Sequence, residues 1–334
     1  MKNRRLFCVL WVIALLCISL SCQETHVIRR AIFDIGSGTT RMTIADVNAK
    51  TGEVTLVHET AEPVSYKLDL ESNKNEFSEE IRNKGTLVLA KMKWAALQQG
   101  AQEFAAVATS AFRTAQNGSE FAQFITKVLG IRLSIISQEQ EGILGFLAAA
   151  QKENKEKIVV WDIGGGSMQL TTMDGNGKFH VYGGKLASVS FASYIIQTIQ
   201  KKDISKVKTP NPIAPEEMEK AISHAKSSLG EIPSIVREKL KDPKTVVLGI
   251  GGVHYYSIRN QIGMGNTYTV VRLKETLDQR LGKTDAEIGG EYANTEVSNL
   301  GLVLAFMQEM GLESVKTKKV NNTNGMMLYP DLWK

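Results

Sequence analysis

The chain has 334 residues, of which 43% are hydrophobic and 22% charged, and its formal net charge is +5. This composition excludes a disordered or collagen-like chain, and the length is sufficient for two domains of ordinary size. No segment repeats at the period of a solenoid or a propeller.

The first 22 residues have the pattern of an export signal. Lys2, Arg4 and Arg5 precede a short apolar run that ends at Cys22. A basic start and a short apolar run are typical of a secretory signal peptide, whereas a stable membrane span needs about 20 apolar residues. Ser21 and Cys22, followed by polar residues, resemble a bacterial lipoprotein signal in which Cys22 is lipidated. The alternatives are an uncleaved anchor and ordinary signal cleavage, and all three predict an exported protein of the periplasm or cell envelope.

Removing this segment changes both the charge and the cysteine content. A mature chain that starts at Cys22 has a net charge of only +2, so the sequence does not predict a nucleic-acid partner. The three cysteines, Cys8, Cys17 and Cys22, all lie in the signal region. The mature body therefore offers no disulfide, cysteine nucleophile or cysteine-based metal site, and the five histidines show no metal-ligand spacing.

After the signal, the chain predicts a first α/β unit over residues 29–150. Residues 30–47 alternate as strand, tight turn and strand, and residues 54–60 add a third strand. Ser78 can cap a helix within residues 75–101, since Glu79 and Glu80 suit its first turn. The following elements are expected in the order strand 104–108, a helix ending near 130, strand 133–136 and helix 139–150.

A charged connector over residues 152–157 precedes a second unit, predicted over residues 157–330. It repeats the first pattern, with strand, glycine turn, strand, turn and strand over residues 157–182. The remaining elements are expected as a helix over 191–201, a loop over 209–215, a helix over 216–229, a strand over 245–250 and mostly helix thereafter. This duplication predicts two related domains that face a cleft.

Each unit opens with a strand that ends in an aspartate and a glycine turn, at Asp34 and Asp162. Glycine lets backbone N–H groups approach an anion, and an aspartate at a strand end can hold a hydrated Mg²⁺. Gly249-Ile-Gly-Gly252 follows an apolar strand and forms a third such turn. Three structural turns without a ligand would be the alternative, but the repetition favours a phosphate-binding site.

These stretches resemble the actin, Hsp70 and sugar-kinase superfamily and, within it, the exopolyphosphatase/guanosine pentaphosphate phosphohydrolase (Ppx/GppA) family. The resemblance covers most of residues 30–260. The stretches that carry it are FDIGSGTTRM at 33–42, ATSAFRTAQN at 108–117, IISQEQEG at 135–142, WDIGGGSMQL at 161–170, LASVSFA at 186–192 and LGIGG at 248–252. It implies an α/β fold of two RNase-H-like (actin-like ATPase) domains with a phosphate-binding cleft between them.

The resemblance also implies residue roles. Glu141 corresponds to the family's catalytic glutamate, which activates the attacking water, and Arg113 to the basic residue beside the phosphate chain. Asp34 and Asp162 would support Mg²⁺. Phosphate would be held by the turns Gly36, Ser37, Gly38 and Thr39, by Gly164, Gly165, Gly166 and Ser167, and by Gly251. For Glu141 alone, a solvated carboxylate at a helix start is the alternative, and for Arg113 it is a surface ion pair.

The sequence departs from the family pattern at two positions. Gln169 stands where the second turn usually carries a glutamate, and Gln140 where a second glutamate often precedes the catalytic one. An amide adds no negative charge for Mg²⁺. The site therefore has two fewer carboxylates than the family pattern, although its glycine turns are intact.

The predicted function is hydrolysis of terminal phosphates from inorganic polyphosphate, or from guanosine pentaphosphate, with Mg²⁺ and a water activated by Glu141. Polyphosphate is preferred because an exported protein does not meet cytoplasmic nucleotides. The alternatives are an exported protein that binds polyphosphate or another phosphorylated ligand without turnover, and a kinase or chaperone-like ATPase of the same superfamily. The membrane, through the lipid anchor, and a second copy in a homodimer are the other expected partners.

Overall fold

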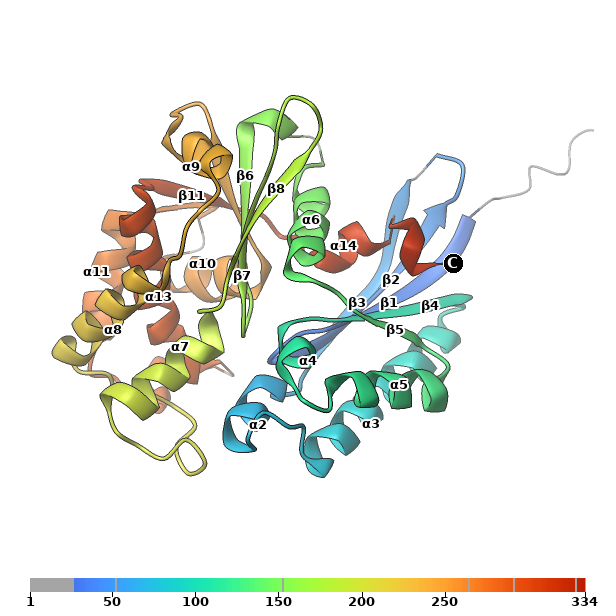
Figure 1. The fold of residues 1–334 in the computed structure, drawn as a ribbon, viewed down its shortest axis with the longest axis horizontal. Helices are drawn as coiled ribbons and strands as arrows, with labels where there is room; N and C mark the ends of the chain where they lie inside the picture. Colours follow the sequence, from blue (N-terminus) through green and yellow to red (C-terminus); the bar gives the residue numbers. More distant parts are fainter. Residues whose placement is uncertain are drawn as a thin grey trace, which may run out of the picture.

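The computed structural model describes residues 27–333 except residues 52, 152, 264, 291 and 328. The predicted signal peptide and the lipidation site Cys22 lie outside the described residues. Two sheets with helices packed around them stand side by side, as Figure 1 shows. The predicted α/β fold of two related units is confirmed.

The first sheet has the strand order β3-β2-β1-β4-β5. Its strands are β1 (Val27–Ile35), β2 (Thr39–Asn48), β3 (Val54–Pro63), β4 (Glu103–Ala108) and β5 (Arg132–Ile135). β1, β2 and β3 form an antiparallel meander, whereas β4 and β5 run parallel to β1. The helices of this unit are α2 (Tyr66–Ser72), α3 (Glu79–Gln98), α4 (Ser110–Thr114) and α5 (Gly118–Leu129).

Capping and burial explain the long helix of this unit. The Ser78 side chain accepts a hydrogen bond from the Ile81 amide, so α3 begins where the sequence predicts a cap. The apolar side chains of α3 and α5 pack beneath the sheet in one core with Phe33, Phe77 and Phe112. The α3 and α5 segments thus cover one face of the sheet (Figure 1).

The second sheet has the order β10-β11-β9-β6-β7-β8. Its strands are β6 (Ile158–Ile163), β7 (Met168–Met173), β8 (Phe179–Gly184), β9 (Val246–Ile250), β10 (Thr267–Thr269) and β11 (Ser314–Thr317). Its helices are α7 (Ser188–Tyr194), the π-helix η2 (Ile195–Ile199), α8 (Pro215–Ser228), α9 (Ser234–Lys241), the π-helix η3 (Gly252–Ile258), α10 (Arg259–Gln261), α11 (Val270–Arg280), α12 (Asp285–Ile288) and α13 (Ala293–Met310). α13 is buried over most of its length in the core of this unit.

The two sheets share one topology. β6 pairs with an antiparallel β7–β8 meander on one side and with parallel β9 and β11 on the other, as β1 pairs with β2–β3 and with β4 and β5. The second sheet differs by the extra strand β10. The internal duplication read from the two Asp-Ile-Gly segments thus has a structural counterpart.

A helix of each unit crosses to the other. α6 (Gln138–Ala149) follows the first sheet but buries Phe146 against residues of the second, including Phe179. α14 (Asn322–Met326) follows the second sheet and packs in a core with Ile32 of β1. In Figure 1, α6 and α14 lie next to each other between the sheets. The domain boundary near residue 150 stays a prediction. The helix that precedes it, α6, belongs to the first unit in the sequence but packs on the second sheet.

Some local expectations were incomplete. The short helices α2 and α4 were not predicted, because each has only one or two turns of periodic signal. The segment after residue 252 contains β10 and β11, which are too short for alternation to identify. None of the helices in the described part of the chain is long and apolar enough to span a membrane.

Candidate functional site

Asp34 and Asp162 occupy equivalent places in the two sheets. Each lies one residue before the end of the central strand, and each strand turns back in a tight hairpin. In the first hairpin the Gly36 amide donates to the Thr39 carbonyl at 3.0 Å, and in the second the Gly164 amide donates to the Ser167 carbonyl at 2.9 Å. The duplication therefore extends to the hydrogen bond that closes each turn.

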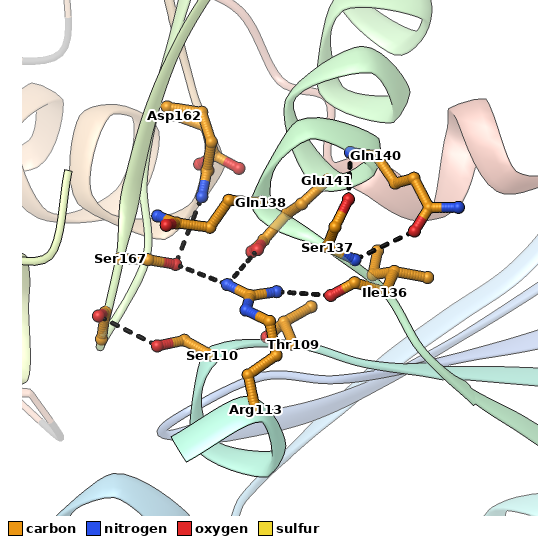
Figure 2. A network of polar contacts seen from close by, with 12 residues as sticks. Thr109, Ser110, Arg113, Ile136, Ser137, Gln138, Gln140, Glu141, Asp162 and Ser167 are labelled. Atoms are coloured by element: carbon orange, nitrogen blue, oxygen red, sulfur yellow. Dashed lines mark hydrogen bonds and ion pairs between the residues drawn. The ribbon is translucent and has the colours of Figure 1, made fainter. Parts of the chain in front are cut away.

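The two turns meet face to face. A Cβ built on Gly165 would lie 2.9 Å from the Cβ of Ser37, and one built on Gly166 would lie 2.8 Å from the hydroxyls of Ser37 and Ser110. The Ser110 hydroxyl also donates to the Gly166 carbonyl at 3.0 Å (Figure 2). Glycine is needed in the second turn because the first turn occupies the space of a side chain.

Arg113 links the first unit to α6 and to the second turn. Its guanidinium donates to the Ile136 carbonyl at 2.7 Å, to Glu141 Oε2 at 2.9 Å and to Ser167 Oγ at 3.3 Å, as Figure 2 shows. Gln169 Nε2 donates to the same Ser167 oxygen at 3.2 Å. With two donors already directed at its oxygen, the Ser167 hydroxyl hydrogen is free to donate to a ligand.

Glu141 lies in the first turn of α6. Ser137 caps this helix and forms a reciprocal capping box with Gln140. This cap fixes the start of α6, so that Glu141 is buried and points to Arg113, while Glu139 and Gln140 stay exposed. Gln140 is therefore part of the cap and lies outside the buried network.

The three carboxyl groups of the site all have raised pKa values. Burial, opposed in part by Arg113 and reinforced by the charges of Asp162 and Asp34, raises the pKa of Glu141 to about 7. Burial, together with the charge of Asp34, raises the pKa of Asp162 to about 7, against the effect of Arg41. Burial likewise raises the pKa of Asp34. The site thus concentrates negative charge that a bound cation would relieve.

The residues opposite the two aspartates differ in charge. In the strand register Arg41 pairs with Asp34, and Gln169 pairs with Asp162. Arg41 Nη1 lies 3.9 Å from Asp34 Oδ2, so the first hairpin supplies a cation where the second supplies a neutral amide. Because Arg41 also lowers the pKa of Asp162, its charge is felt on both sides of the site.

The third glycine turn and the C-terminal segment complete the surroundings of Asp162. Gly251 has a φ of 77°, and a Cβ there would lie 2.4 Å from Asp162 Oδ1. Asn322, at the start of α14, donates to Asp162 Oδ2 at 3.5 Å, and its own Oδ1 is buried without a partner. The absence of a side chain at Gly145 lets this amide approach, since a Cβ there would lie 2.9 Å from Asn322 Oδ1.

The donor set fits a hydrated Mg²⁺. Asp34 Oδ1 is a buried carboxylate oxygen without a hydrogen-bond partner, and the charge of Asp34 is close enough to raise the pKa of Asp162. Mg²⁺ usually keeps several waters and uses one or two carboxylates together with substrate phosphates. Over the residues that the structure describes, no three acidic or histidine side chains form a ready-made metal cage. Asp34 and Asp162 would therefore hold the ion together with water and substrate.

The structure places the residues singled out from the sequence around one point between the sheets. They are Asp34, Gly36, Ser37, Gly38, Thr39, Arg113, Glu141, Asp162, Gly164, Gly165, Gly166, Ser167 and Gly251. Sequence reasoning missed Arg41, Ser110 and Asn322. Arg41 follows Asp34 by seven residues, just as Gln169 follows Asp162, and this shared spacing could have indicated Arg41. Nothing in the sequence indicates that Asn322 lies at this site.

His254, which follows the third turn, does not act as a cation here. It is fully buried against Trp161, and its Nδ1 lies 2.7 Å from the Tyr268 hydroxyl. Burial lowers the pKa of His254 to about 3, so the imidazole is neutral at physiological pH.

Comparison with known proteins identifies relatives of this fold and site. The model of the Ppx/GppA phosphatase family matches residues 43–287. The bifunctional 3-dehydroquinate synthase/phosphatase of Fusobacterium nucleatum is 30% identical over 149 residues, which are 42% of this chain and 22% of that protein. Exopolyphosphatase 1 of Mycobacterium leprae is 26% identical over 145 residues, 43% of this chain and 42% of that protein. The matched segment thus spans less than half the length of either curated relative.

Solved structures of similar fold cover nearly the whole chain. The Aquifex aeolicus Ppx/GppA enzyme has a TM-score of 0.69 at 20% identity, covering 90% of this chain and 99% of its own. An exopolyphosphatase from Cytophaga hutchinsonii has a TM-score of 0.71 at 15% identity, covering 90% and 97%. At such low identity these similarities establish the two-domain, actin-like fold.

Proposed function

Because this chain belongs to the Ppx/GppA phosphatase family, we propose that it is an exopolyphosphatase-like phosphohydrolase that removes the terminal phosphate of inorganic polyphosphate. The observation that carries this proposal is the buried Glu141, bonded to Arg113 at 2.9 Å and electrostatically coupled to both hairpin aspartates. The exopolyphosphatase activity named for the mycobacterial relative supports the choice of reaction.

In this proposal Glu141 is the general base. A carboxylate takes a proton from water while the water oxygen attacks the terminal phosphorus, and the bond to the bridging oxygen breaks. The bridging oxygen leaves with the shortened chain, and the proton stays on Glu141. A general base works best when its pKa lies near the operating pH, and burial moves the pKa of Glu141 toward that range.

Arg113 and the glycine turns would hold the phosphates. A guanidinium donates two parallel hydrogen bonds to phosphate oxygens, and the Ser167 hydroxyl has a hydrogen to donate. Arg113 contacts Glu141 and Ser167 at once, so it lies between the general base and the turn that would hold the phosphate. Mg²⁺ held by Asp34 and Asp162 would neutralise the charge on the phosphoryl oxygens.

The choice of substrate rests on the predicted cellular location of the protein. A signal-like N-terminus predicts that the mature chain is exported and membrane-anchored, where guanosine pentaphosphate and ATP are scarce. Inorganic polyphosphate can be extracytoplasmic, so we expect it to be preferred over guanosine pentaphosphate.

Gln169 favours a second candidate function. If the missing carboxylate prevents Mg²⁺ from being held, the protein would bind polyphosphate without hydrolysing it. Gln169 is almost completely buried and stands opposite Asp162, so it supplies a neutral amide at the position of the missing carboxylate. This alternative predicts tight polyphosphate binding with no phosphate release.

The test follows phosphate release from long-chain polyphosphate by the chain in the presence of Mg²⁺. We expect the wild type to release phosphate, and Glu141→Gln to lose activity by about 10²–10⁴-fold, as for removal of a general base. The matched control is Glu139→Gln, which changes an exposed carboxylate two residues earlier on the same helix and should retain activity. If the wild type binds polyphosphate but releases no phosphate, the hydrolase proposal is wrong and the protein is a polyphosphate-binding protein.

A further inference from the structure

The exposed large apolar side chains are unevenly distributed between the two units. Of the twelve in the described part of the chain, eight lie on elements of the first sheet or on its two long helices. Single exposed apolar residues are ordinary, but a cluster of them marks a surface that is covered in function.

Five of these residues lie at the start of β1 or in the C-terminal halves of α3 and α5. They are Val27, Trp94, Leu97, Phe124 and Val128, here called the apolar edge. Trp94 is 65% exposed and Val128 54% exposed, although each lies near the last turn of its helix.

Hydrogen bonds bring the parts of the apolar edge together. Arg29, two residues after Val27, donates to the Gln99 carbonyl directly after α3, at 2.8 Å. Lys93 of the last turns of α3 reaches the Leu129 carbonyl at the end of α5, at 2.5 Å. The start of β1 therefore lies near the end of α3, and the end of α3 near the end of α5; Figure 1 shows α3 and α5 below the first sheet.

The charge around the apolar edge is mostly positive. Exposed lysines on α3, on α5 and in the turn between β2 and β3 are Lys91, Lys127 and Lys50, and Glu53 is an exposed acidic residue near Lys50 in that turn. The acidic side chains Asp46 and Glu103 are paired with Arg29 and Arg30. A face that combines a tryptophan, aliphatic side chains and lysines matches the interface of an anionic bilayer.

The distance to the predicted anchor limits where the bilayer can be. Val27 follows Cys22 by only five positions, and a chain of that length spans at most roughly 18 Å. A lipid on Cys22, or an uncleaved apolar segment that ends there, would therefore hold the bilayer surface close to the start of β1.

We propose that the apolar edge is a membrane-docking face, which lies on an anionic lipid bilayer when the N-terminal segment is anchored in it. The inference rests on the anchoring proposed above and is independent of the hydrolytic reaction. β1 extends roughly 25 Å from Val27 to the site at its other end, at about 3.3 Å per residue. Docking through this edge turns the site away from the membrane, toward a soluble polyanion.

Trp94 provides the measurement. The full chain carrying Trp11→Phe, which removes the tryptophan of the signal region, is reconstituted with vesicles of phosphatidylcholine and phosphatidylglycerol, with or without bromine on the acyl chains. Bromine quenches tryptophan only within the bilayer. We expect the chain to float with the vesicles, and the bromine-dependent quenching to fall by at least half in Trp94→Phe.

A second pair of variants tests the whole face. Leu97→Glu combined with Val128→Glu should reduce the quenching of Trp94 at least twofold, with the chain still floating. Val271→Glu, which changes an exposed valine of the second unit, should leave it unchanged. Flotation with equal bromine-dependent quenching in the Trp11→Phe chain and in its Trp94→Phe variant would overturn the docking face but retain the anchor. Absence of flotation would overturn both. Neither result bears on phosphate release.

Discussion

At the scale of single residues, the site is defined by two side chains that stand opposite two equivalent aspartates. Arg41 and Gln169 each follow their aspartate by seven residues and pair with it across a hairpin. One side chain is a cation and the other a neutral amide, so the duplicated hairpins have different charges. This asymmetry places the positive charge in the first unit, and leaves Asp162 without an ionic partner on its own hairpin.

Gln169→Glu should strengthen Mg²⁺ binding. The new carboxylate would lie opposite Asp162 and add a negative ligand, so the Mg²⁺ concentration for half-maximal phosphate release should fall about tenfold. The measurement is phosphate release at graded Mg²⁺ concentrations. Gln140→Glu is the matched control, because it makes the same change at an exposed cap and should shift the requirement much less. An equal shift in both variants would contradict a specific role for position 169.

At the scale of elements, the two hairpins that we expect to bind phosphate also form the contact that joins the units. Gly165 and Gly166 contact Ser37 and Ser110 so closely that a side chain would not fit. Packing between the units thus requires these glycines, whether or not they bind phosphate. A second contact joins α2 to α7, where the Ser193 hydroxyl donates to Glu71. The position of one unit relative to the other is therefore fixed by the contact between the two hairpins and by the neighbouring contact between α2 and α7.

Gly165→Ala should destabilise the protein by about 1–3 kcal/mol, because the new methyl group would overlap Ser37. Ser37→Gly removes the nearest atom but leaves Val189 Cγ2 at 3.3 Å, so the double variant should recover part of the loss. Both are measured by denaturant unfolding. Gly175→Ala is the control, since a Cβ there meets no atom within 4 Å. A double variant no more stable than Gly165→Ala alone would show that the hairpins are not packed in this way.

At the scale of the whole molecule, three carboxylates from three segments share one buried space. Asp34 comes from the first sheet, Asp162 from the second and Glu141 from the helix that crosses between them. Their mutual repulsion is present only in the folded chain. Folding therefore works against ionisation of these groups, and a cation bound among them would stabilise the folded chain.

These carboxyls should make the stability of the protein depend on pH. In the unfolded chain they lose their protons at about pH 4, whereas in the folded protein Glu141 and Asp162 do so at about 7. The folded state therefore binds more protons between these values, and the free energy of unfolding falls as pH rises toward 7. Thermal unfolding without divalent cations should show the melting temperature decreasing from pH 5 to pH 7.

Glu141→Gln should reduce this slope, because the amide does not titrate, whereas Glu139→Gln should preserve it. A melting temperature that rises over the same interval in the wild type would contradict the raised pKa values. Mg²⁺ at saturating concentration should reduce the decrease, since a cation favours the ionised carboxylates.

Much of this protein follows from local chemistry in its sequence. The two Asp-Ile-Gly hairpins and the meanders that contain them follow from apolar alternation and glycine turns, and the start of α3 follows from a capping serine. All of these signals act over a few residues. For the same reason Asp34 and Asp162 could be singled out, since each stands at a strand end before a glycine turn. Arg113 and Glu141 were indicated only by the resemblance to the Ppx/GppA family, because their own surroundings in the sequence equally suit a surface ion pair and a solvated carboxylate.

The tertiary structure decided what depends on distant segments meeting. Examples are the position of α6 on the second sheet, the packing of Gly165 against Ser37, and the contact between Asn322 and Asp162, which are 160 positions apart in the sequence. Burial and charge at such a meeting point set the pKa of Glu141, and they are properties of the folded core, where water is excluded and several charges are felt at once. Local sequence determined which chemical groups this protein carries, and packing of the two halves determined which of them act together.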